Sequence, residues 1–87
     1  MNLRPIKQNM TELEVSETLG KKVLFSYRTP VAVVGFDPDA KDFYQFKTDK
    51  KWSNTTSRHV TLWFKEMGIE SKGVGTKPQE FFDGLVK

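Results

Sequence analysis

Apolar and polar residues alternate in the first half of the chain, as they do in strands that have one buried face. In residues 11–15, two apolar side chains share one face and two glutamates share the other. Residues 22–28 and 31–36 also predict strands, because they are rich in β-branched and aromatic residues. Pro30 lies between these two segments and suits either a tight corner or a bulge. We favour the bulge, which makes the two segments one long bent strand.

A turn is predicted over residues 37–41, which contain a proline that presets φ and aspartates that can bond to nearby backbone. Residues 42–48 are therefore expected to fold back as the second strand of a hairpin. On this strand Phe43 lies on one face and Tyr44 and Phe46 lie on the other, so both faces are expected to contact other groups.

The period of the apolar residues changes after residue 53 to that of a helix. Four apolar residues recur at i, i+3, i+4 and i+7, which is the spacing of a buried helical stripe: Val60, Trp63, Phe64 and Met67. Gly68 follows at the position of a C-terminal glycine cap, and the polar residues 53–57 supply several candidate N-caps. The main helix is therefore expected near residues 55–67.

Beyond this helix, residues 69–77 contain two glycines and are expected to form a flexible loop. Residues 76–79 resemble a capping box that opens a short helix, for which the apolar anchors would be Phe81, Phe82 and Leu85. The fold class predicted from these elements is α+β. It consists of a three- to four-stranded antiparallel β-meander, with the main helix packed on one face and the short C-terminal helix alongside.

The length of 87 residues predicts one domain and leaves homodimerisation open as a source of stability. We expect a flexible N-terminal arm over residues 1–10 and a single α+β domain over residues 11–87. The chain has no cysteine and no apolar run long enough to span a bilayer, and its first residues lack the apolar stretch of a signal peptide. These features predict a cytoplasmic protein that does not engage membranes.

The sequence offers little for catalysis. With one histidine, His59, and no cysteine, a Ser-His-Asp or Cys-His arrangement or a histidine-based zinc site would need unusual ligands. Glu12, Glu14 and Glu17 lie in or beside a strand face that we expect to be exposed, where carboxylates are usually solvated. We therefore predict a non-enzymatic protein without catalytic residues, metal or cofactor.

The formal net charge of +3 is concentrated in residues 21–60, which carry eight basic and four acidic groups. Lysines, an indole, several hydroxyls and an arginine come together there at the start of the main helix. Helix N-termini present unpaired N–H groups, so this segment is a candidate site for phosphate groups, and its tryptophan is a candidate for stacking on a base. The candidate nucleic-acid-binding residues are Lys47, Lys50, Lys51, Trp52, Ser53, Thr55, Thr56, Ser57 and Arg58.

The same segment also has a purely structural interpretation, because serine and threonine cap helices, lysines occupy exposed turns and tryptophan packs at sheet–helix junctions. The aromatic residues suggest a different function. Eleven of them in 87 residues are more than one small core readily hides, so some are expected to be exposed and to form a protein-binding patch. The alternative is that two helices cover both faces of the sheet. The expected partner is therefore nucleic acid, either DNA or RNA, or another protein.

Two motifs, LFSYRTPVA in residues 24–32 and WSNTTSRH in residues 52–59, resemble those of a family of small uncharacterised phage-encoded proteins. The resemblance covers roughly residues 12–65 and implies a viral accessory protein that acts by binding in the cytoplasm of the host cell. Such a protein would engage the nucleic-acid backbone through its basic hairpin and helix N-terminus. The alternative is that it binds and modulates a host protein, either a defence complex or a host enzyme.

Overall fold

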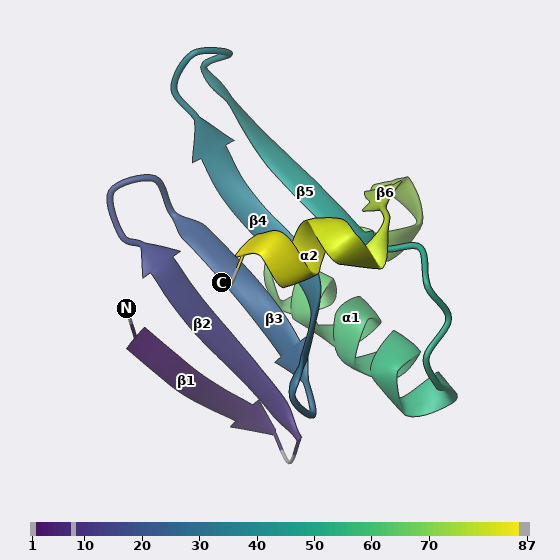
Figure 1. The fold of residues 1–87 in the computed structure, drawn as a ribbon. Coiled ribbons are helices and arrows are strands. Elements are labelled where there is room, and N and C mark those ends of the chain that lie inside the picture. The colour runs from purple at the N-terminus through teal and green to yellow at the C-terminus, as the bar shows by residue number, and fades with distance from the viewer. Residues whose placement is uncertain (1, 8, 86–87) are drawn as a thin grey trace.

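The computed structural model describes residues 2–7 and 9–85, in which a six-stranded sheet lies between two helices (Figure 1). The strands follow one another in the sheet in chain order: β1 (Asn2–Lys7), β2 (Met10–Ser16), β3 (Lys21–Ser26), β4 (Thr29–Asp37), β5 (Asp42–Thr48) and β6 (Gly75–Lys77). Strands β1 to β5 pair antiparallel, whereas β6 runs parallel to β5. The α+β class is confirmed, but the sheet is mixed and larger than the expected meander of three to four strands.

One of the added strands comes from the N-terminus. Residues 2–7, expected as part of a flexible arm over residues 1–10, form β1 and pair with β2, with Leu3 opposite Leu13. The sequence hides this strand because it contains Pro5, which lacks a donor for the ladder. An edge strand tolerates proline, since one side of its backbone has no partner strand.

The segment around Pro30 forms a hairpin, so the expected single bent strand is wrong. Strands β3 and β4 are joined by residues 27–28, and Tyr27 adopts a left-handed φ of 61°. That conformation reverses the chain tightly, which the alternation of residues does not reveal. The register of this hairpin shifts between Leu24 and Phe25, whose partners are Ala32 and Pro30, so an irregularity lies beside Pro30 but does not join the two segments into one strand.

The main helix, α1 (Asn54–Glu66), packs on one face of the sheet and confirms the predicted apolar stripe. Trp63 and Phe64 are fully buried there against Leu24 and neighbouring residues of the sheet. The helix begins after Ser53, whose hydroxyl accepts from the N–H of Thr56 at 3.1 Å. It ends before Gly68, which has a φ of 75° and thus the left-handed conformation that glycine adopts without strain.

The short helix, α2 (Gln79–Leu85), crosses the opposite face of the sheet, so the expectation that it lies alongside α1 is wrong (Figure 1). Phe82 is fully buried on that face against Val23 and Val33. The preceding residues 69–77, expected as a flexible loop, contain a 3₁₀ turn (Ser71–Gly73) and β6. Both faces of the sheet are therefore covered.

Coverage of both faces explains the position of Glu12, which was expected to be solvated. The side chain points to the α1 side and is only 5% exposed. Its carboxylate accepts a hydrogen bond from Nε1 of Trp63 at 2.9 Å and pairs with Nε of Arg4 at 3.1 Å. Alternation of apolar and polar residues shows which side chains share a face of a strand. It does not show whether the polar face is exposed to solvent.

Candidate nucleic-acid interface

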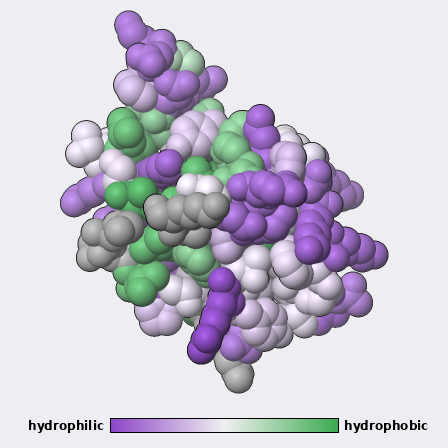
Figure 2. Space-filling view, viewed as in Figure 1, coloured by the Kyte–Doolittle hydropathy of each residue, from purple (hydrophilic) through white to green (hydrophobic). Residues whose placement is uncertain are grey.

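The connection between β5 and α1 borders a pocket of about 270 Å³ that we call the basic pocket. Six of the nine candidate binding residues line it: Lys47, Lys50, Lys51, Trp52, Thr56 and Ser57. Figure 2 shows that hydrophilic surface gathers on this side of the molecule, near β6 and the start of α1, whereas apolar surface lies over β2 and β3. The fold thus brings most of the predicted segment around one concave surface.

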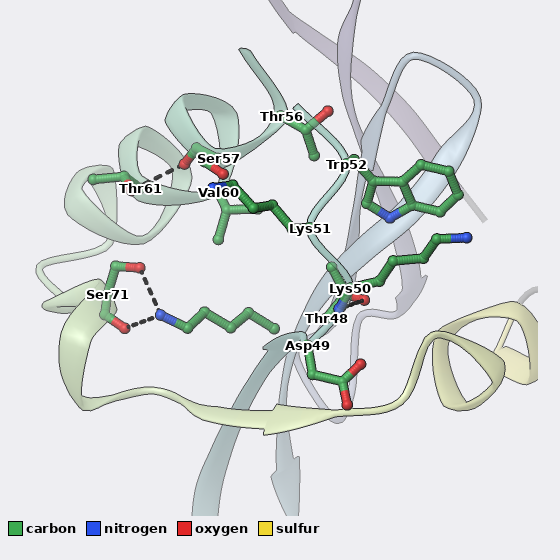
Figure 3. A pocket seen from close by; sticks show the side chains of 11 residues that line it. Thr48, Asp49, Lys50, Lys51, Trp52, Thr56, Ser57, Val60, Thr61 and Ser71 are labelled. Atoms are coloured by element: carbon green, nitrogen blue, oxygen red, sulfur yellow. Dashed lines mark hydrogen bonds between the residues drawn. The ribbon is translucent and has the colours of Figure 1, made fainter. Parts of the chain in front are cut away.

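The lysines of the basic pocket differ in how they are held. The ammonium group of Lys47 donates to the backbone oxygen of Ser71 at 2.8 Å. Lys50 lies 4.1 Å above the centre of the Trp52 ring, a cation–π contact. Lys51 leaves the chain in a different direction from Lys50 and extends toward α1 (Figure 3). Three positive charges therefore surround the pocket from different sides.

One acidic group reduces this positive potential. Asp49 lines the same pocket and is exposed, so the lining carries three lysines against one carboxylate. The net charge of the lining is therefore positive, as an anion site requires.

The hydroxyls at the start of α1 serve mostly to hold the helix. Thr56 is buried, and its hydroxyl lies 3.0 Å from Oγ of Ser26 and accepts from Ser53 at 3.3 Å. Oγ of Ser26 in turn lies 2.8 Å from Nδ1 of His59, which is itself buried. These four side chains form one network that anchors the N-terminus of α1 to β3. The sequence analysis proposed that Ser53 and Thr56 contact phosphate. In the structure, their hydroxyls instead form hydrogen bonds within the protein.

The remaining candidates lie on the outside of the helix start. Ser57 is exposed and lines the basic pocket, whereas Thr55 and Arg58 are exposed but do not line it. The geometry therefore places Ser57 with the lysines. It does not bring Thr55 or Arg58 to the same concave surface.

Gln79 is a contact residue of this region that the sequence did not single out for binding. Its side-chain oxygen accepts from Nε1 of Trp52 at 3.1 Å and from the hydroxyl of Thr48 at 2.8 Å. Its side-chain nitrogen donates to the backbone oxygen of Pro30 at 2.8 Å and to Asp83 at 3.1 Å. These partners differ from the capping box predicted for residues 76–79, in which the Gln79 side chain would accept from the backbone N–H of Thr76. The side chain ties α2 to β4, β5 and the indole, over sequence distances that no local pattern signals.

No curated protein and no solved structure matches this chain significantly. A family model, however, matches residues 1–84. The chain belongs to DUF8033, a family of unknown function.

The DUF8033 match extends from β1 into α2. It therefore includes the sheet and the helices on both of its faces. No helix within residues 2–7 and 9–85 of this DUF8033 protein is long and apolar enough to cross a membrane. In those same residues, no three His, Asp or Glu side chains are grouped as metal ligands.

Proposed function

We propose that this DUF8033 protein is a non-enzymatic binding protein that holds the phosphate backbone of a nucleic acid in the basic pocket. The observation that supports the proposal is the shared location of Lys47, Lys50, Lys51 and the partly exposed Trp52 around one concave surface. Lysines neutralise phosphates and release the counterions condensed on the polymer, which supplies most of the affinity in sequence-independent binding. Ser57, at the edge of the pocket, adds a hydroxyl that can donate to a phosphate oxygen.

The proposal predicts a specific dependence on salt. Each phosphate neutralised on a single strand contributes about −0.7 to the slope of log K against log salt, so three lysines give about −2. Raising the salt fourfold should then weaken binding about 20-fold. The measurement is fluorescence anisotropy of labelled mixed-sequence DNA and RNA at several salt concentrations.

A charge-removing variant tests whether the basic pocket is responsible. Lys50→Gln combined with Lys51→Gln should lower the same fourfold salt effect to about 2- to 3-fold. Lys41→Gln, which removes one charge where the double variant removes two, is a control for the loss of lysine charge elsewhere. Lys41 is exposed in the turn between β4 and β5, and this turn lies at the far end of the hairpin (Figure 1). Weak binding that does not respond to salt, or an equal loss in the control, would remove the nucleic-acid proposal.

A protein partner is the alternative, and one observation favours it. Phe43 is 70% exposed on β5, where its ring meets Phe36 edge-on at 5.1 Å between centroids. Exposed aromatic residues dominate protein interfaces. Under the resemblance to phage-encoded proteins, either partner would be a molecule of the host cell. Retention of a host protein from nuclease-treated lysate by the wild type but not by Phe43→Ser would favour this alternative.

A further inference from the structure

A second pocket lies beside the basic pocket and shares Trp52 and Thr56 with it. It has a volume of about 190 Å³, and we call it the ring pocket because two exposed aromatic rings border it. Trp52 is 43% exposed and Tyr27 is 52% exposed. The lining residues are Ser26, Tyr27, Thr29, Val31, Trp52, Ser53 and Thr56. None of the sequence motifs predicted that the β3–β4 turn and the start of α1 would form one cavity.

We propose that the ring pocket receives one unpaired base of a single-stranded nucleic acid, with its neighbouring phosphates in the basic pocket. The inference rests on the proposed function, because the lysines supply the attraction for the strand. It goes further by naming the physical state of the ligand: a base that is not already paired inside a duplex.

The indole is held in place before any ligand arrives. Gln79 accepts from its Nε1, and Lys50 covers one face of the ring. Lys50 itself is not among the residues that line the ring pocket. A ring fixed by neighbours loses little conformational freedom when a base stacks on it, which favours affinity.

Tyr27, which carries the second ring, has an unusual backbone conformation. Tyr27 has a φ of 61°, a region that bulky side chains rarely adopt. Its N–H donates to the backbone oxygen of Asn9 at 2.6 Å, and its ring lies 6.2 Å from the ring of His59. A strained position that exposes an aromatic ring beside a cavity is a typical feature of ligand sites.

The size and the polar groups of the ring pocket fit a base better than a larger ligand. Small-molecule sites usually exceed about 300 Å³, so a pocket of about 190 Å³ has room for a single ring system. Tyr27 and Thr29, which line the pocket, each carry a hydroxyl, and a hydroxyl can donate or accept. Such groups suit the edges of all bases, so we expect little sequence preference.

Three oligonucleotides of equal length separate the base contact from the backbone contact. They are a mixed-sequence single strand, the same strand with abasic sites, and the duplex. Since stacking on an aromatic ring strengthens binding about 5- to 150-fold per base, the single strand should bind that much tighter than the abasic strand. It should also bind tighter than the duplex. The emission of Trp52 should change on binding, whereas Trp63, which is 1% exposed, should not respond.

Two variants test the rings. Tyr27→Asn removes one ring and places there a residue that tolerates left-handed φ, and Trp52→Leu removes the other. Each should lower the affinity for the single strand to that for the abasic strand, with the salt slope unchanged. Phe43→Asn is the control, because it removes an exposed ring outside both pockets. Circular dichroism confirms that each variant is folded.

The outcomes distinguish the two proposals. If no oligonucleotide binds in a salt-dependent manner, the proposed function fails and the ring pocket fails with it. If intact and abasic strands bind equally with the salt slope retained, the ring pocket is refuted while the backbone site stands. Equal affinity for duplex and single strand, or equal losses in Phe43→Asn and Tyr27→Asn, would also overturn the base-binding inference.

Discussion

Replacing Glu12 with leucine would remove the buried carboxylate that accepts from the indole of Trp63 and pairs with Arg4. The side chain of Arg4 is 61% exposed, so its ion pair contributes at most about 1 kcal/mol. The larger effect comes from Nε1 of Trp63, which donates at 2.9 Å from a ring that is 1% exposed. A buried donor left without an acceptor costs about 1–3 kcal/mol. The expected loss is therefore about 2 kcal/mol.

For a chain of this length, about 2 kcal/mol corresponds to a fall in melting temperature of about 8–16 °C. Glu12→Gln should cost less, because its amide oxygen still accepts from the indole. The assay is thermal unfolding followed by circular dichroism in the wild type and in Trp63→Phe, which lacks the indole N–H. In the Trp63→Phe background, Glu12→Leu should cost about 1 kcal/mol or less. If Glu12→Leu cost as much stability in that background as in the wild type, the cost could not come from a buried indole N–H left without an acceptor.

The same carboxylate predicts a dependence of stability on pH. Burial by itself raises the pKa of Glu12, but hydrogen bonds from Arg4 and Trp63 and the charge of Arg4 together leave the pKa below its usual 4.5. The native state thus binds fewer protons than the unfolded state, and the contribution is complete above pH 4.5. This contribution to the free energy of unfolding is lost as the pH falls through the native pKa of Glu12. The difference in free energy of unfolding between the wild type and Glu12→Gln should therefore narrow in that range.

Two further substitutions test local packing and capping. In Gly35→Ala, the added Cβ would lie 2.6 Å from Cζ of Tyr44, so the overpacking should destabilise the protein by about 1–3 kcal/mol in urea unfolding. Gly73→Ala, where nothing lies within 4 Å, should change stability by less than about 0.5 kcal/mol, and equal effects would contradict the steric argument. Ser53→Ala should cost about 0.5–2 kcal/mol in thermal unfolding by removing the N-cap of α1. Thr55→Ala, on the exposed side of the same turn, should cost less, and an equal loss would argue against capping by Ser53.

The elements of the fold that depend on neighbours in the chain were predictable. The turn at residues 37–41, the hairpin strand after it and the main helix all appear where the patterns placed them. The end of α1 at Gly68 was also predictable, because a left-handed C-terminal residue favours glycine whatever surrounds it. These features are governed by backbone conformation and by the period of side chains, which any short segment carries by itself.

The candidate site was predictable in part for the same reason. Lys47, Lys50, Lys51 and Trp52 are close in sequence, so a turn before a helix keeps them close in space. Gln79 was not predictable as a partner of Trp52, because 27 positions separate them along the chain. Tyr27 was hidden as well, since its place beside Trp52 depends on a left-handed turn and on how α1 docks on β3.

The sequence alone therefore determined the hairpin of β4 and β5, the main helix and the grouping of basic residues before it. The tertiary structure alone decided that the first residues form an edge strand, that α2 crosses the face opposite α1 and that Glu12 is buried. The physical reason is that burial depends on which surfaces meet. Trp63 and Glu12 are 51 positions apart, and only the packing of α1 on the sheet makes the buried indole N–H and the carboxylate partners.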